Sequence, residues 1–200
     1  MSKIALVILA LSLSVPPAAA QVPKVNLFVG YSYAHADLTT SAIASHQGPS
    51  VATGNLNGWN ASVEGKVAPF LGFVADVSGH YGTPTASSVC TLFPSCGTAI
   101  GPVHSRLYNF LGGPQVSFSI GRIRPFAHAL VGASHVSETA STTLFFELSD
   151  TSFANAFGGG FDYRLIGPLG WRVQVDYLKT RFFGNTQDDV RISTGIILRL

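Results

Sequence analysis

Residues 24–34 read KVNLFVGYSYA, and their strict alternation is the clearest fold signal in the chain. In an extended segment, one side would carry Val25, Leu27, Val29, Tyr31 and Tyr33. The opposite side would carry Asn26, Phe28, Gly30, Ser32 and Ala34. Because successive side chains of a strand point to opposite faces, this period of two indicates a β-strand that separates two different environments.

Seven further runs repeat this alternation: Asn57–Val67, Leu71–Gly82, Arg106–Phe118, Ile123–Val136, Phe153–Leu165, Trp171–Thr180 and Val190–Leu200. In the fourth of these runs the alternation is weaker and only slightly favours Arg124 and His128 on the polar side. Short connections, such as Ala68–Phe70, alternate with long ones. The long connections are Leu38–Gly54, Thr83–His104, Ser137–Thr151 and Arg181–Asp189. Eight strands joined in this way predict an all-β, antiparallel up-and-down barrel.

The two faces of these runs differ in chemistry. The apolar face carries no charged residue, whereas the other face is small and polar with a few charges. Charged residues make up only 11% of the chain, against roughly 25% in ordinary soluble proteins. A soluble barrel would need many more charges on its exterior, so the pattern favours a transmembrane β-barrel with its apolar face in lipid. The alternative is a secreted β-sandwich or lipocalin-like barrel, which would require the opposite arrangement of the faces.

Aromatic residues gather at both ends of the predicted strands. Near the long connections lie Tyr33, Trp59, Tyr81, Tyr108, Phe153 and Tyr177, and near the short ones lie Phe118, Tyr163 and Trp171. Tyrosine and tryptophan prefer the membrane–water interface, so two belts of this kind support the membrane assignment.

The first twenty residues have the features of an export signal. Lys3 precedes the apolar run Ile4–Leu13, and Ala18-Ala19-Ala20 offers a cleavage site. We therefore expect residues 1–20 to be a signal peptide and residues 21–200 to form one barrel domain. No later stretch is long and apolar enough for a membrane-spanning helix. A formal net charge of +2 gives no basis for binding nucleic acid.

The strand phrasing resembles the outer-membrane β-barrel family typified by the OmpA transmembrane domain. The similar segments are Val29–Tyr33, Phe110–Pro114, Pro125–Gly132 and Gly158–Tyr163. The resemblance implies a bacterial outer-membrane location, insertion by the barrel assembly machinery, contact with outer-membrane lipid and lipopolysaccharide, and a non-enzymatic role. Two departures are the expected lack of a peptidoglycan-binding domain and a final Leu200 where such barrels often end in Phe.

The charges of the polar face are expected to meet inside the barrel. The predicted lumen network consists of Glu64, Lys66, Asp76, Arg124, Asp162, Arg164, Arg172, Asp176 and Arg199. Counted from the short turns, the basic residues form a ring and the acids lie in a layer slightly deeper. Opposite charges at this separation should pair rather than line an open pore, so we expect a side-chain-plugged lumen.

The long connections carry two further predictions. Cys90 and Cys96 lie close together in an exported chain, which favours a disulfide, although two free thiols remain an alternative. Phe145, Phe146, Phe182 and Phe183 form apolar clusters. We expect these clusters to contact an extracellular partner, because loops on a rigid scaffold commonly carry recognition.

No cofactor or metal site is expected, because the six histidines follow no metal-binding spacing. The sequence therefore favours a structural, adhesive or surface-binding role. A lipid A deacylase or acyl transferase is an alternative implied by similar barrels, with His80, His104 or His135 activating a nearby serine. A small channel is a second alternative.

Overall fold

The computed structural model describes residues 24–40, 47–90, 98–140, 146–182 and 186–200. Its strands are β1 (Val25–Thr40), β2 (Gln47–Lys66), β3 (Leu71–Gly82), β4 (Thr85–Cys90), β5 (Thr98–Ser117), β6 (Ile123–Ala140), β7 (Phe146–Ile166), β8 (Leu169–Thr180) and β9 (Gln187–Arg199). Within these ranges, no helix has the length and hydropathy required to cross a membrane.

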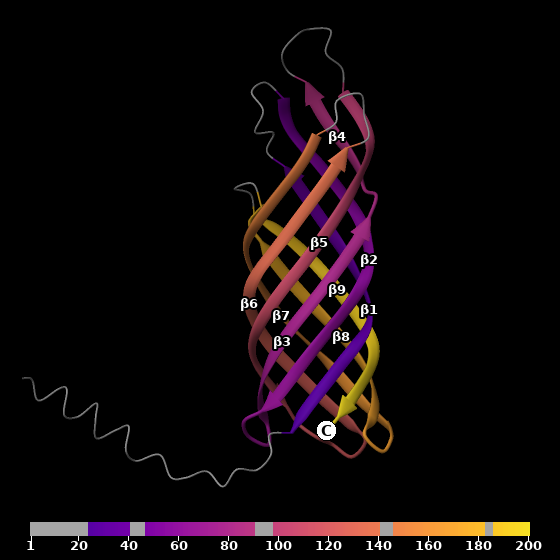
Figure 1. Ribbon diagram of the computed structural model, residues 1–200, viewed down its shortest axis with the longest axis vertical. Helices are drawn as coiled ribbons and strands as arrows, with labels where there is room; N and C mark the ends of the chain where they lie inside the picture. Colours follow the sequence, from indigo (N-terminus) through magenta and orange to yellow (C-terminus); the bar gives the residue numbers. More distant parts are fainter. Residues whose placement is uncertain (1–23, 41–46, 91–97, 141–145, 183–185) are drawn as a thin grey trace, which may run out of the picture.

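The strands close into a barrel, as Figure 1 shows. Each strand pairs antiparallel with its neighbours, and β1 pairs with both β2 and β9. The segment β4 continues β3, because both pair with β2 in one register: Asn57 lies opposite Tyr81, and Thr53 opposite Thr85. Pro84, which has no backbone N–H, lies in the break between them. The nine segments thus form the eight barrel strands that the sequence predicts.

The strands are longer than the alternation alone indicates. The first predicted long connection, Leu38–Gly54, forms strand pairs as far as Thr40 opposite Ser50. The third, Ser137–Thr151, forms them as far as Ala140 opposite Phe146. These segments are rich in Thr and Ser, and Thr is common in strands, so their ladders continue the barrel hydrogen bonds. As a result, β1, β2, β4 and β5 extend beyond β8 and β9 at the end away from the C-terminus (Figure 1).

The opposite end closes with tight turns. Gly121 and Gly167 have φ of 62° and 56° in the β5–β6 and β7–β8 turns. Glycine reaches this left-handed conformation without the steric cost that a Cβ would add, so these turns can be short.

The barrel is apolar outside and polar inside. Large apolar side chains such as Val29, Phe73 and Val175 are exposed on the outer wall, whereas Asn60, Asp76 and other polar groups are buried. This distribution is inverted relative to a soluble barrel and matches a wall that faces lipid. The weakest face prediction is confirmed as well: Arg124 and His128 are buried, and Val131 is exposed.

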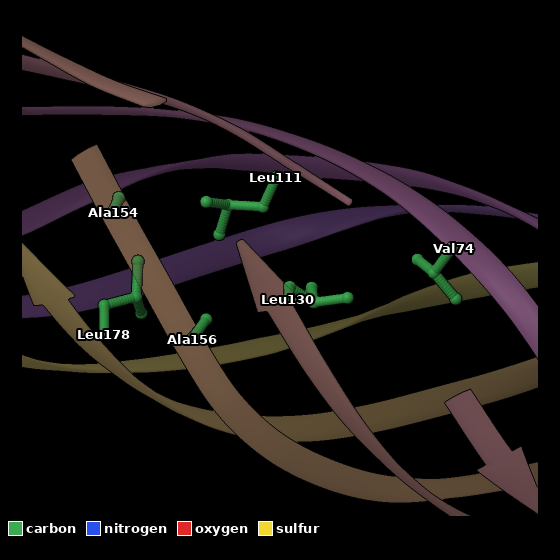
Figure 2. Packing of buried hydrophobic residues seen from close by; sticks show 6 residues of the cluster. All are labelled: Val74, Leu111, Leu130, Ala154, Ala156 and Leu178. Atoms are coloured by element: carbon green, nitrogen blue, oxygen red, sulfur yellow. The ribbon is translucent and has the colours of Figure 1, made fainter. Parts of the chain in front are cut away.

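Two apolar clusters share the interior with the polar groups. The first, shown in Figure 2, contains Val74, Leu111, Leu130, Ala154, Ala156 and Leu178. The second, which we call the apolar cap, contains Ala34, Leu56, Leu107, Val136 and Phe182. The cap lies nearer the extended end, because Leu107 precedes Leu111 on the descending strand β5.

Candidate functional site

The lower charge network crosses the lumen near the short turns. Arg124 Nη2 forms an ion pair with Glu64 Oε1 and donates to Ser117 Oγ at 2.7 Å. On the other side, Asn26 Nδ2 donates to Glu64 Oε2 at 2.7 Å. All four residues are buried, so this contact joins β1, β2, β5 and β6 through groups that have lost their water.

Asp162 completes the lower network by gathering three arginines. Arg172 Nε and Nη2 donate to its two oxygens at 2.6 and 3.1 Å. Arg124 and Arg199 each approach Asp162 Oδ2 to 3.7 Å. Bidentate arginine–carboxylate pairing is among the strongest and most directional of protein hydrogen bonds.

The Arg172 guanidinium is also held by aromatic faces. Its Cζ lies 4.3 Å from the ring centroid of Phe126 and 5.3 Å from that of Phe28. Such contacts stabilise a cation that has been removed from water.

The upper network is centred on Arg191, which is 0% exposed. Arg191 Nη1 donates to Asp76 Oδ1 at 2.7 Å, and Nη2 donates to Asp176 Oδ2 at 2.6 Å. His128 Nε2 lies 2.7 Å from the second oxygen of Asp176. Asn60 links the same level to β2 through a 2.8 Å bond to Asp76. The two networks together tie opposite walls of the barrel.

Most of the predicted lumen charges come together. Glu64, Asp76, Arg124, Asp162, Arg172, Asp176 and Arg199 all take part in the two networks. Lys66 and Arg164 do not belong there, contrary to the prediction. Lys66 Nζ donates to the Pro69 carbonyl at the β2–β3 turn, and Arg164 is exposed at the barrel end.

The predicted layering is wrong in one respect. The acids occupy two levels instead of one, because Glu64 and Asp162 lie nearer the short turns along their strands than Asp76 and Asp176 do. Arg191 was missing from the predicted network, although it lies on the polar face. Strand pairing carries the signal that would have found it, since Arg191 is directly opposite Asp176 in the β8–β9 hairpin.

The apolar cap corrects another prediction. Phe182 was expected to contact a partner, but its side chain is fully buried against Leu56, Leu107 and Val136. A single aromatic residue after β8 can fold back over the lumen. More of its apolar surface is then removed from water than if it stayed at the loop surface.

Several predicted loop residues fall outside the described structure. These are Phe145, Phe183 and Cys96, together with the side chains of Phe146 and Cys90. The predicted disulfide and the remaining aromatic contacts therefore stay predictions.

Of the three histidines considered for catalysis, one contacts a serine and two contact threonines. His80 Nε2 lies 2.9 Å from Ser32 Oγ, but both side chains are 0% exposed inside the barrel. At the outer rim, His104 contacts Thr83 at 3.3 Å and His135 contacts Thr151 at 2.8 Å. Among the described residues, no group of three potential metal ligands is present.

The outer rim has its own chemistry. Arg106 and Arg181 are exposed at the extended end, and Lys179 forms a half-exposed ion pair with Asp188 at 3.6 Å. Directly below Arg106 on β5 lies Tyr108, which belongs to the upper aromatic belt. Cations thus stand just above the apolar wall.

Comparison with known proteins agrees with this architecture. A family model described as the outer membrane protein beta-barrel domain matches residues 4–197. No curated protein sequence is similar enough to count as a relative.

Solved structures match over most of the chain. Neisserial surface protein A (TM-score 0.57, 15% identity) aligns over 87% of this chain and 97% of its own. The attachment invasion locus protein Ail of Yersinia pestis (0.55, 11%) aligns over 88% and 99%. The outer membrane protease OmpT of Escherichia coli (0.52, 8%) aligns over 90% and 98%. At these identities the likeness concerns the fold.

Proposed function

Because the chain belongs to the outer membrane protein beta-barrel domain family, and so lies in the bacterial outer membrane, we propose that it is a non-enzymatic barrel that binds partners at the cell surface. In this proposal, residues 1–20 direct export, the barrel assembly machinery inserts the domain, and lipopolysaccharide surrounds its outer rim. Recognition belongs to the strands that extend above the aromatic belt.

The observation that carries the proposal is the contrast between the two parts of the barrel. Inside, ion pairs and the apolar cap fill a space that eight strands leave only wide enough for side chains. Outside, β1 and β2 remain paired as far as Thr40 and Ser50. A filled lumen offers little for transport, whereas a tall, rigid sheet is a suitable scaffold for loops that bind a partner.

A catalytic role has less support. Nucleophilic catalysis needs a base next to an accessible nucleophile, and the one described histidine–serine pair, His80 with Ser32, is enclosed. Since the similar structures include a protease, the test of the proposal includes a measurement of enzymatic change.

The test is to shorten the extended part of the sheet and to keep the barrel below it; the deletion also removes the β2 residues that pair with β4. Residues 37–53 are replaced by Asn-Gly, so that Ala36 and Gly54, which lie opposite each other, are joined by a two-residue turn. Bacteria that express the complete or the shortened protein are compared for retention on epithelial monolayers and on glass. Heat-modifiable migration on gels verifies that both forms fold.

We expect the shortened form to fold and to lose retention. A matched variant that joins Val136 to Asp150 in the same way removes the β6–β7 extension and identifies which hairpin contributes. Unchanged retention in both shortened forms would contradict the proposal. Altered lipid A in the expressing strain would replace it with the enzymatic alternative.

A further inference from the structure

We propose that the periplasmic mouth of the barrel binds a phosphate-bearing anion, held by Arg199 together with Lys24 and Lys66. The mouth is the end of the lumen beside the short turns and the C-terminus (Figure 1), and short turns face the periplasm in barrels of this kind. The site lies at the opposite end from the proposed adhesive surface and does not depend on the adhesive role.

Charge is divided unevenly along the barrel. Of the ten acidic residues in the chain, only Glu64 and Asp162 lie near the short turns, and both are buried in the lower network. The same end carries seven of the twelve basic residues: Lys24, Lys66, Arg122, Arg124, Arg164, Arg172 and Arg199. Residues 1–23 add no acid. Even with the carboxylate of Leu200 counted as a further acid, positive charge remains in large excess at this end.

Five of these residues form what we call the basic ring: Lys24, Lys66, Arg122, Arg164 and Arg199. Each lies two residues beyond a buried lumen side chain of its own segment, on the side toward the mouth. The ring contains two like-charged pairs in direct opposition. Lys66 N donates to Lys24 O at 3.0 Å, and Arg164 N donates to Arg122 O at 2.8 Å. Like charges directly opposite each other on neighbouring strands are destabilising, so an anion bound between them is favourable.

Arg199 is the least satisfied cation of the lower network. Arg172 makes two hydrogen bonds with Asp162, and Arg124 forms an ion pair with Glu64. Arg199 is left with an approach of 3.7 Å to Asp162, although its side chain is only 17% exposed. Its Nε and Nη2 have no hydrogen-bond partner among the described residues. Three arginines thus share two carboxylates, and a cation removed from water requires closer pairing than Arg199 receives.

Strand pairing places the two lysines beside Arg199. Arg199 lies opposite Asn26 on β1, so Lys24, two residues nearer the mouth, is its diagonal neighbour at roughly 7–8 Å. Lys66 lies directly across from Lys24 on β2. One donor of Lys66 Nζ is used by the Pro69 carbonyl at 3.1 Å, and an ammonium group has three. Long side chains from three adjacent strands can therefore converge on one anion below the network.

The residue types favour phosphate as the anion. A phosphate group presents several oxygens, which suit the planar fork of an arginine together with the point charges of two lysines. Arg122 and Arg164 belong to the same mouth and add to its positive potential. Both a soluble phosphate and the headgroup of an inner-leaflet phospholipid carry this group, and the experiment distinguishes them.

The experiment uses the complete mature protein in phosphatidylcholine nanodiscs, which leave both ends of the barrel accessible. Affinity for inorganic pyrophosphate is measured by calorimetry, with succinate as the dicarboxylate comparison. Retention of phosphatidylglycerol from mixed nanodiscs is measured by native mass spectrometry. The ring variants are Arg199→Gln and the pair Lys24→Gln with Lys66→Gln. The control, Arg106→Gln with Arg181→Gln, removes two exposed arginines at the opposite end, and heat-modifiable migration on gels verifies that every form folds.

We expect the wild type and the control to bind the phosphate probe, and both ring variants to bind it at least about tenfold more weakly, which is the effect of one charge-assisted hydrogen bond. Loss of pyrophosphate binding in the ring variants identifies a soluble phosphate, and loss of phosphatidylglycerol retention identifies a lipid headgroup. Ring variants that match the control with both probes would overturn the proposal, and so would succinate binding as tight as that of pyrophosphate. Retention of cells on surfaces should not depend on the ring, so failure here is separable from failure of the adhesive role.

Discussion

Arg191 is the residue on which the upper network depends, because its guanidinium is shared by two aspartates from different strands. Replacing it with Met would leave Asp76 and Asp176 buried with one cation fewer. Removing one partner of a buried pair costs about 3–5 kcal/mol, so we expect a loss of this order in the free energy of unfolding, measured with urea in lipid vesicles.

Two controls separate this effect from generic damage. The triple variant Arg191→Met, Asp76→Asn, Asp176→Asn removes the stranded charges and should recover much of the lost stability. Lys179→Ala breaks the half-exposed pair with Asp188 and should cost no more than about 1 kcal/mol. A small loss in Arg191→Met would mean that the lumen is wet enough to solvate the aspartates.

The orientation of the strands can also be tested at one position. Val175 is 48% exposed on the outer wall of β8. Val175→Arg places a cation in the lipid, which costs roughly 2–4 kcal/mol near mid-depth, whereas Val175→Leu should be close to neutral. Equal refolding yields for the two variants in vesicles would show that this face does not meet lipid.

At the scale of elements, the β5–β6 seam differs from its neighbours. Ser117 N donates to Phe70 O toward β3, and Phe118 N donates to Pro125 O toward β6. The backbone N–H groups of even-numbered β5 residues therefore point toward β6. Pro114 is even-numbered, and proline has no N–H to donate to that strand. The pairing of Gly113 and Pro114 with β6 is missing, while β6 and β7 pair without interruption.

This seam should open more readily than the others. A recess of about 300 Å³ on the lipid side is lined by Pro114, Val116, Ala127, His128 and Ala129. We expect Pro114→Ala, which restores a donor opposite Ala129, to slow hydrogen exchange of the adjacent β6 amides. The β6–β7 amides serve as the internal reference. Exchange that is equally slow in both seams of the wild type would contradict this expectation.

The sequence predicted the elements better than their contacts. Alternation is a local signal, so it identified the faces of Trp171–Thr180 and even of the weakly patterned Ile123–Val136. It could not give the length of the extended hairpins, because Thr, Ser and other polar residues there do not alternate regularly with apolar ones. It also missed Phe182 in the cap and Arg191 in the network, since both depend on which strands stand across the lumen from each other.

For the whole molecule, the two kinds of closure act in series along one lumen. The apolar cap, which includes Phe182, lies toward the extended end, and the ion pair of Arg124 with Glu64 lies toward the short turns. An ion crossing the barrel would have to pass both. We therefore expect no stable conductance from the wild-type protein in planar bilayers.

Because the two closures lie in series, each can be weakened separately and the current through the barrel measured. Phe182→Ala should open a gap in the cap but leave the charge networks, and Glu64→Ala should remove the ion pair of Arg124 with Glu64 but leave the cap. Each single variant should therefore stay closed to steady current. Glu64→Ala should lose stability, because the buried Arg124 then keeps only the 3.7 Å contact with Asp162 as an ion pair. The double variant weakens both closures but keeps the Arg191 network and the six-residue apolar cluster, so we expect brief openings instead of steady current. Phe182→Leu combined with Glu64→Ala is the control that keeps an apolar cap. Steady, long-lived conductance in the wild type would rule out a plugged barrel. Openings in either single variant would show instead that one closure alone seals the lumen.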